Sequence, residues 1–434
     1  MLQLLKQRNF FIFWLGEIIS VVGDHISLIA FPWLVLQMTG SPMMMGLVLA
    51  AQGLPKAALM LFGGVFVDRS SPRKVMLLAD IVRFFVMLGL GLMIGAGTQT
   101  MPLIFLAAFI FGVADAFFYP ATTSILPSLV KKDELQKANA IIQMTTHTAI
   151  ILGPIIAGLL IVGSFALPDT SAAALAQIPS LHDNDNTGLA RAFIVDAWTF
   201  GVSILTLLLI KVRPLHEDKD ETATSMWSEI KEALQFVWSI PAMRLIFFVI
   251  AILEFFFQAP IFVGLPVLAK ARFVDGALIY GMILGSYGLG ALIGSGVSGT
   301  VKQFAPNTIA RRLCLVFAWS GMTLGLIVLF PAYQIAMLLF FTAGFGDNFI
   351  WVQFSTWLQQ TTPEHLLGRV MSVLIFLAIG MLPIANMIMG ALFELNLYAT
   401  LITCSIIMTV VCLFAAFHKD VHLVNPLGGK TKAG

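Results

Sequence analysis

A few ionisable side chains stand in stretches of the sequence that are otherwise apolar. They lie near the middle of their stretches at Asp24, His25, Lys56, Asp115, Glu254 and Asp347, and somewhat off centre at Glu17 and His147. These stretches are long enough to cross a bilayer, where an ionisable group near the centre costs roughly 2.5 to 3.5 kcal/mol on insertion scales. Each of these positions therefore calls for a chemical reason.

Carboxyl groups that are shielded from water can bind and release protons, which makes the acids of this set candidate proton-binding residues. They are Asp24, Asp115, Glu254, Asp347 and Glu17. Glu17 and Asp24 are seven residues apart, so they share one face of a helix. The alternative is that the acids form static ion pairs, for instance with Lys56, and only specify the register of neighbouring helices.

The amino-acid composition indicates that most of the chain lies in an apolar environment. Of the 434 residues, 59% are hydrophobic and 11% are charged, whereas ordinary soluble domains carry about 25% charged residues. The net charge of +2 and the lack of a basic run with interleaved aromatics exclude a nucleic-acid partner. The three cysteines lie in apolar segments and are interpreted as small buried hydrophobes, not as a disulfide or metal framework. The lipid bilayer is therefore the expected environment.

Stretches of spanning length, about 20 apolar residues, occur in two sets of six. They run approximately over 10–36, 43–66, 75–96, 102–127, 138–163 and 191–211, and then over 243–269, 277–301, 309–330, 334–359, 366–393 and 396–417. Lys and Arg of the short loops concentrate on the side of the N-terminus, which predicts that both termini are cytoplasmic. The first stretch is too long for a signal-peptide core, so we expect it to be retained.

Two connections are longer than the rest. The outward segment 164–190 contains His182, Asp183 and Asp185, for which a solvated loop is the favoured interpretation and a cation site the alternative. The central segment 212–240 has apolar residues at helical spacing, which predicts an amphipathic helix on the cytoplasmic interface, or alternatively a helix for a partner. The predicted domains are thus 1–211, a linker at 212–240, 241–417, and a cytoplasmic tail at 418–434.

The two sets of six also share sequence features. Gly112, Asp115 and Phe117 align with Gly344, Asp347 and Phe349 at an offset of about half the chain. Transporters are commonly built from such duplicated bundles, with the substrate site between them.

Specific motifs now point to a family. The segment Gly63-Gly64-Val65-Phe66-Val67-Asp68-Arg69-Ser70-Ser71-Pro72-Arg73-Lys74 resembles the signature of the major facilitator superfamily. The opening from Arg8-Asn9-Phe10 through Gly23-Asp24, the stretch from Pro120 to Gly158, and Thr362-Pro363-Glu364 with Gly368-Arg369-Val370-Met371-Ser372 resemble its bacterial branch of macrolide exporters and the enterobactin exporter. The resemblance implies an all-α membrane protein of 12 transmembrane helices in two six-helix bundles.

The resemblance also implies a cytoplasmic gate motif at Gly64, Asp68, Arg69 and Arg73, in which Asp68 locks against a helix end of the other half. A carboxylate is stabilised at a helix N-terminus by the macrodipole and free N–H groups. Ser71 and Pro72 depart from the signature, which would weaken the lock. For Arg73 and Lys74, simple positive-inside topology is the alternative.

Gly153, Pro154 and Gly158 resemble the antiporter-type kink of the superfamily, whose glycines allow close helix approach. This motif favours export, and a generic kinked helix is the alternative.

In the superfamily fold, the first, second, fourth, fifth, seventh, eighth, tenth and eleventh helices surround the cavity. The ionisable residues within the apolar stretches with which this section began all lie on one of them. Arg83 of the third span is the exception, and we expect it near the cytoplasmic end, where it would snorkel or pair with Asp68 or Asp80. Candidates to line the cavity or contact the substrate are His25, Lys56, His147, Phe118, Tyr119, Phe256 and Trp351.

These features together predict a secondary active transporter that exports a hydrophobic or amphipathic small molecule (a drug, a macrolide-like compound or a siderophore) by alternating access, as a proton antiporter. We expect a monomer in the bacterial inner membrane, driven by the proton gradient, with no cofactor and no metal. The alternatives are a flippase for lysophospholipid or another lipid, and a non-transporting membrane sensor. No catalytic motif of an enzyme occurs in the sequence.

Overall fold

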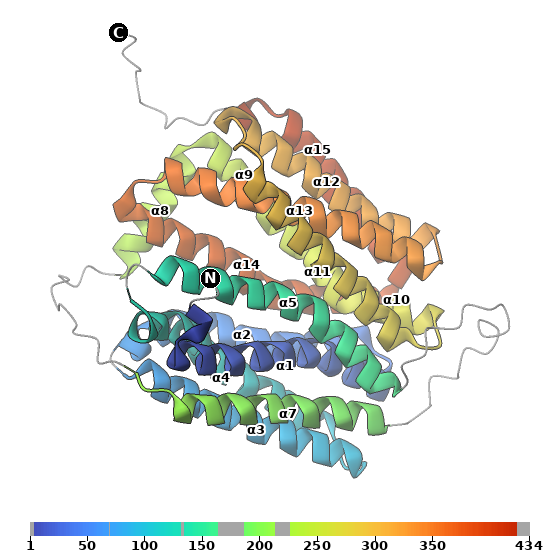
Figure 1. Ribbon diagram of the computed structural model, residues 1–434. Coiled ribbons are helices and arrows are strands. Elements are labelled where there is room, and N and C mark those ends of the chain that lie inside the picture. Colours follow the sequence, from blue (N-terminus) through green and yellow to red (C-terminus); the bar gives the residue numbers. More distant parts are fainter. Residues whose placement is uncertain (1–3, 69, 132–133, 164–185, 213–225, 423–434) are drawn as a thin grey trace, which may run out of the picture. The chain divides into compact units, whose positions relative to one another are not determined.

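A computed structural model describes residues 4–68, 70–131, 134–163, 186–212 and 226–422. This part of the chain is helical throughout (Figure 1). Arg69 and the polar loop residues His182, Asp183 and Asp185 lie outside the described residues, so the alternatives for that loop stay predictions.

The described residues contain 12 helices that are long and apolar enough to cross a membrane, as the hydropathy pattern predicts. The α-helices in chain order are α1 (Arg8–Thr39), α2 (Pro42–Asp68), α3 (Pro72–Gly95), α4 (Met101–Leu129), α5 (Leu135–Val162), α7 (Asn186–Leu209), α8 (Met226–Ser239), α9 (Pro241–Leu253), α10 (Leu265–Arg272), α11 (Gly276–Thr300), α12 (Pro306–Leu329), α13 (Tyr333–Thr361), α14 (Glu364–Leu395) and α15 (Leu397–Phe417). Helix α8 lies in the segment where an amphipathic helix is predicted, with Val237 buried and Trp238 exposed.

The seventh span is continuous but irregular. It begins as α9, passes through two π-helical turns, η3 (Glu254–Gln258) and η4 (Pro260–Gly264), and ends as α10. Pro260 lacks a backbone N–H and cannot donate in the regular helical pattern. π-Helical turns are frequent at functional sites, and the first of these begins at a candidate acid, Glu254.

The chain divides into two compact units. The first comprises Met1–Asp218, Phe262–Gly288 and Asn386–Leu397, and the second comprises Lys219–Ile261, Leu289–Ala385 and Tyr398–Gly434. Within the first unit, α1 packs along α7 and α5, α2 packs along α4, and α3 packs along α7 and α4. In the second unit, α12 packs along α13 and α9. The domain limits at 211 and 240 stay a prediction.

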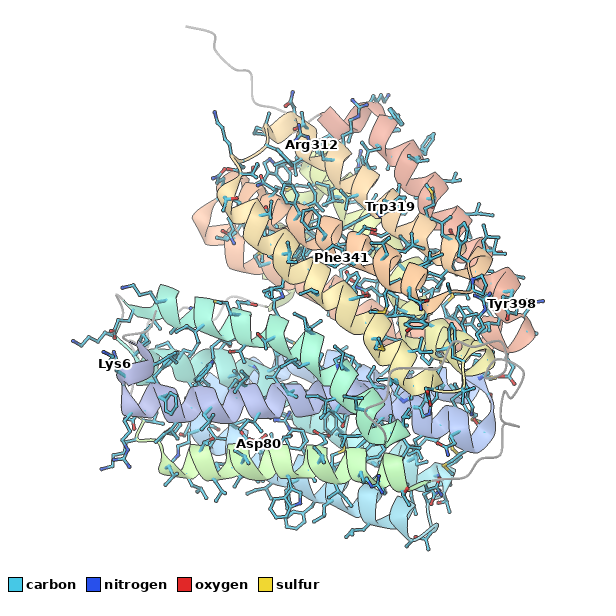
Figure 2. The ribbon with its side chains drawn as sticks, turned by 45° about the vertical axis from the view of Figure 1, so that its right-hand side comes forward. Lys6, Asp80, Arg312, Trp319, Phe341 and Tyr398 are labelled. Atoms are coloured by element: carbon cyan, nitrogen blue, oxygen red, sulfur yellow. The ribbon has the colours of Figure 1, made fainter. Side chains whose placement is uncertain are left out.

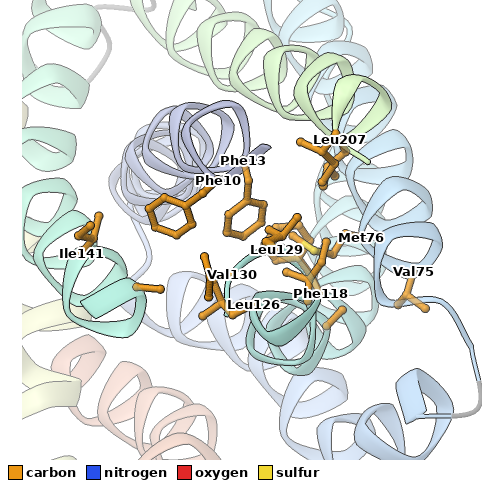
Figure 3. Close-up of a cluster of buried hydrophobic side chains, with 14 of the residues drawn as sticks. Phe10, Phe13, Val75, Met76, Phe118, Leu126, Leu129, Val130, Ile141 and Leu207 are labelled. Atoms are coloured by element: carbon orange, nitrogen blue, oxygen red, sulfur yellow. The ribbon is translucent and has the colours of Figure 1, made fainter. Parts of the chain in front are cut away.

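A cluster of apolar side chains closes the interior of the first unit (Figure 3). Phe10 and Phe13 of α1 meet Met76 of α3, Leu126 of α4 and Leu207 of α7, and all five are buried. Close packing of this kind fixes the relative position of the helices. The polar side chains that follow farther along the same helices are therefore held in defined positions.

Candidate functional site

The best-defined polar group of the first unit centres on Arg83 of α3, whose side chain is 0% exposed. Its Nη2 lies 2.5 Å from Oδ1 of Asp80, one helical turn earlier on α3. The other oxygen of Asp80 accepts a hydrogen bond of 2.7 Å from the Ser203 hydroxyl of α7. Asp80 is likewise 0% exposed and lies inside the helices of the first unit (Figure 2). A buried cation and a buried anion thus neutralise each other.

Two aromatic rings lie close to the guanidinium. Its central carbon lies 3.8 Å from the centroid of the Phe118 ring of α4 and 4.5 Å from that of Phe200 of α7. The faces of aromatic rings attract cations, and the attraction strengthens away from water. These contacts hold Arg83 in one orientation.

Two further carboxylates share the remaining edge of Arg83. Its Nη1 lies 3.4 Å from Oδ1 of Asp24 on α1 and 3.5 Å from Oδ1 of Asp115 on α4. The second oxygen of Asp115 lies 2.5 Å from Nζ of Lys56 on α2. We call Asp24, Lys56, Asp80, Arg83 and Asp115 the ion network. Four helices, α1 to α4, contribute to it.

The ion network has a buried part and an accessible part. The side chains of Asp24, Asp115 and Lys56 are 27%, 16% and 29% exposed, in contrast to Asp80 and Arg83. The first three side chains are therefore partly accessible, and the other two are enclosed by the protein. An accessible carboxylate held by a fixed cation is suited to reversible proton binding.

Asp196 of α7 is a buried acid beside the ion network. It accepts a hydrogen bond from Ser27 of α1 and contacts the hydroxyl of Thr199. A side chain at Gly23 would overlap Asp196 and Thr199, so glycine is needed for α1 and α7 to approach here. Asp196 of α7 therefore lies beside Gly23, the residue that precedes Asp24 on α1.

Three more candidates of the sequence analysis lie on α1 and α5. Glu17 is 5% exposed, and its Oε2 has no hydrogen-bond partner among the described residues. His25 places Nδ1 2.9 Å from the carbonyl oxygen of Val21, which can only accept, so this nitrogen carries the proton. His147 is half-buried, and within the described part of the chain its Nδ1 has no partner.

The second unit contains Glu254 and Asp347, both buried. Asp347 of α13 accepts a hydrogen bond of 2.6 Å from the Ser320 hydroxyl of α12. In the sequence repeat Asp347 aligns with Asp115, but Asp115 is contacted by an arginine of the third span, whereas Asp347 is contacted by a serine of the ninth. The repeat retains the acid and changes its partner.

The aromatic candidates differ in their surroundings. Phe118 is buried and presents its face to Arg83, so its role in the structure is to pack against the guanidinium. Tyr119 is exposed, and Phe256 is half-buried beside Phe255. Trp351 packs against Phe354 with ring centroids 5.6 Å apart.

The gate motif is described only in part. Gly64 and Asp68 belong to the last turns of α2, and the surroundings of the Asp68 side chain lie outside the described residues. Arg73 donates from Nε to the carbonyl oxygen of Leu207 at 2.6 Å and from Nη2 to that of Leu208 at 2.9 Å. These carbonyls belong to the last turn of α7, where a cation is favoured by the helix dipole.

The kink motif lies in α5, which continues through Pro154. A Cβ at Gly153 would overlap His25 Cβ and lie 3.1 Å from the Val22 carbonyl of α1. A Cβ at Gly158 would lie 2.7 Å from Cα of Leu278 in α11. Both glycines therefore allow the backbones of neighbouring helices in the first unit to approach closely.

The structure decides between the alternatives for Arg83 and adds two residues. Of snorkelling and pairing, the pairing with Asp80 is present, and the Arg83 side chain is fully buried. The burial of Asp80 and the acid Asp196 were both missed. Both acids stand in apolar stretches of the sequence, but on the third and sixth spans, which are not among the helices that surround the cavity in the superfamily fold.

A comparison with protein families decides the assignment. The model of the Major Facilitator Superfamily matches residues 13–385. The chain belongs to the Major Facilitator Superfamily. It is therefore a secondary transporter of a small-molecule substrate and not an enzyme.

Relatives and solved structures agree with this membership. The multidrug efflux pump Tap of Mycobacterium tuberculosis is 26% identical over 418 residues, which cover 93% of this chain and 91% of Tap. The enterobactin exporter EntS of Citrobacter koseri is 27% identical over 363 residues, covering 82% and 78%. The crystal structure of a bacterial homologue of the human lysosomal transporter Spinster matches with a TM-score of 0.64 at 14% identity, covering 96% of each chain, and supports the superfamily fold.

Proposed function

We propose that this superfamily member exports a hydrophobic or amphipathic small molecule from a bacterial cytoplasm in exchange for protons, with both termini on the cytoplasmic side. The names of Tap and EntS, a multidrug pump and a siderophore exporter, support an export direction and an amphiphilic cargo. The excess of Lys and Arg in the loops on the N-terminal side supports the orientation.

The ion network is the observation that carries the proton part of the proposal. It holds three carboxylates (Asp24, Asp80, Asp115) and two cations (Lys56, Arg83). Full ionisation leaves one negative charge, and one bound proton makes the network neutral. Because a net charge is costly to move through a low-dielectric interior, loading and unloading one proton would accompany the conformational cycle.

Asp24 is the favoured proton-binding residue of the ion network. Asp80 is enclosed between Arg83 and Ser203, and Asp115 lies against both Lys56 and Arg83. Asp24 is the most exposed of the three acids, and its shortest ion-pair contact, 3.4 Å, is longer than the 2.5 Å contacts that Asp80 and Asp115 make. It can therefore accept a proton with the smallest loss of ion-pair energy.

The test uses purified protein in liposomes with an imposed pH gradient and a fluorescent amphiphilic dye as the substrate. We expect gradient-driven dye transport by the wild type, loss of this drive in Asp24→Asn, and transport close to wild type in the matched control Asp275→Asn, which changes an acid of the loop before α11. Equal gradient-driven transport by Asp24→Asn would remove Asp24 from the mechanism. Transport of lysophospholipid but not of any dye would replace the cargo assignment with a lipid flippase.

A further inference from the structure

One acid of the ion network is enclosed together with a serine outside it. Asp80 of α3 accepts a hydrogen bond from Ser203 of α7, and both are buried. If they served only to neutralise Arg83, the direction in which the guanidinium points would not matter. The contacts around Arg83 indicate that the direction is controlled.

Three side chains confine the guanidinium. Asp80 holds Nη2 at 2.5 Å, and the ring centroids of Phe118 and Phe200 lie 3.8 and 4.5 Å from its central carbon. Asp80 cannot turn away freely, because Ser203 binds its second oxygen. The free edge of Arg83, at Nη1, is consequently aimed at the acids on α1 and α4.

That edge is shared almost equally. Asp24 lies 3.4 Å and Asp115 3.5 Å from Nη1, whereas a saturated charge-assisted hydrogen bond is about 2.7 to 2.9 Å. Neither acid therefore has a full bond to Arg83. Neutralising one acid leaves Nη1 to the other, so the two acids compete for one cation whose position is fixed.

From this geometry we infer that Asp80 and Ser203 are positioning residues, which set the proton affinity of the Asp24–Asp115 pair by fixing where Arg83 points. The inference rests on the proposed proton exchange, whose site it deepens. Asp80 acts as a permanent anchor for Arg83, and the exchangeable proton stays on the accessible acids.

Other charged groups face this site and are included in the argument. Lys56 of α2 contacts Asp115, Asp196 of α7 is packed beside Gly23, and Glu17 lies two turns before Asp24 on α1. None of them contacts the Nη2 edge of Arg83 that Asp80 occupies. Changing Asp80 or Ser203 therefore alters the direction of the Arg83 side chain and the neutralisation of its charge, and leaves these groups in place.

The first variant is Asp80→Asn, which keeps the shape of the side chain and removes its charge. With its anchor neutral, Arg83 interacts more strongly with Asp24 and Asp115, and a lower pH is needed to protonate them. We expect the pH of half-maximal proton-driven transport to fall by about one unit, a tenfold change in proton concentration. Asp80→Glu retains the charge and should restore the wild-type midpoint in large part.

The second variant is Ser203→Ala, which leaves the charge of Asp80 and releases its second oxygen. We expect a smaller shift of the midpoint in the same direction. The matched control is Ser128→Ala, another buried serine, whose hydroxyl binds the backbone of Ile125. It should leave the midpoint unchanged. If Asp80→Asn fails to fold, Ser203→Ala and Asp80→Glu carry the test.

A readout without transport separates this inference from the proposed function. The infrared band of protonated carboxyl groups is followed against pH in the wild type, in Asp24→Asn to identify the Asp24 contribution, and in Ser203→Ala. A shifted titration with no proton-driven transport in the wild type would refute the proposed function and retain the positioning role. Slower transport by the Asp80 and Ser203 variants with unchanged pH midpoints and unchanged titration would overturn the positioning role.

Discussion

At the scale of single residues, the structure gives every buried charge of the ion network a partner. Removing one partner of a buried ion pair leaves an uncompensated charge, at a cost of roughly 3 to 5 kcal/mol, whereas replacing both partners by neutral groups is often tolerated. Arg83 is the extreme case, since it is enclosed by one carboxylate and two rings. Lys56 and Asp115 are partly exposed, so the same rule applies to them in a weaker form.

A first prediction follows for this pair. Lys56→Met leaves Asp115 with Arg83 alone and should lower the melting temperature of the purified protein by several degrees. The double variant Lys56→Met with Asp115→Asn should recover most of the loss, because the unpaired charge is gone. Thermal unfolding of the wild type, both single variants and the double variant completes a double-mutant cycle, which measures the interaction of the two side chains. Additive losses in the double variant would show that the two side chains do not stabilise each other.

The accessible residues of the ion network could be predicted from the sequence, and its buried half could not. Asp24, Lys56 and Asp115 stand out because ionisable side chains are costly in apolar stretches. Asp80 and Asp196 stand in apolar stretches too, but on the third and sixth spans, which are not among the helices that surround the cavity in the superfamily fold. Only the three-dimensional packing shows that one face of α3 and of α7 is directed into the bundle.

At the scale of elements, hydropathy suffices to find the spanning helices, because apolar length is set by bilayer thickness. The two π-helical turns of the seventh span escape this method, since hydropathy does not report which carbonyl each N–H contacts. Helix ends are also decided by contacts that are distant in sequence. Arg73 and the end of α7 are an example, since Arg73 and Leu207 are 134 positions apart in the sequence.

A second prediction concerns this helix end. Arg73→Ala leaves the last carbonyls of α7 without their cation and should destabilise the protein by about 1 kcal/mol, the order of a favourable charge at a helix terminus. Arg73→Lys should restore part of the effect, because an ammonium cannot reproduce the two-point contact. Lys74→Ala, an exposed neighbour, is the control. Hydrogen exchange of the amides near residue 207 gives the local readout, and equal exchange in Arg73→Ala and Lys74→Ala would contradict the capping role.

A third prediction concerns the contact between α1 and α5. Gly153→Ala places a methyl group against His25 and should destabilise the protein by about 1 to 3 kcal/mol, as overpacking generally does. Gly89→Ala in α3 is the matched control, because a Cβ there meets nothing within 4 Å and alanine favours helix. Chemical unfolding measures both variants, and a Gly153→Ala protein as stable as Gly89→Ala would contradict the close approach.

At the scale of the whole molecule, the chain is a twelve-span member of the Major Facilitator Superfamily with a repeated sequence. The aligned acids Asp115 and Asp347 have different contacts, since Asp115 lies against Lys56 and Arg83 whereas Asp347 accepts a hydrogen bond from Ser320. The repeat thus predicts the architecture, while the contacts of the aligned acids diverge between the two halves. A single sequence cannot reveal that divergence, because the partner of Asp115 is on another helix.

The central claim is that substrate and proton move in opposite directions. Its most direct measurement traps a pH-sensitive dye inside liposomes that contain the protein and adds an amphiphilic substrate outside. Entry of substrate should expel protons, so the account predicts that the interior becomes more alkaline with the wild type and does not change with Asp24→Asn. Substrate entry with a constant or more acidic interior in the wild type would contradict proton antiport.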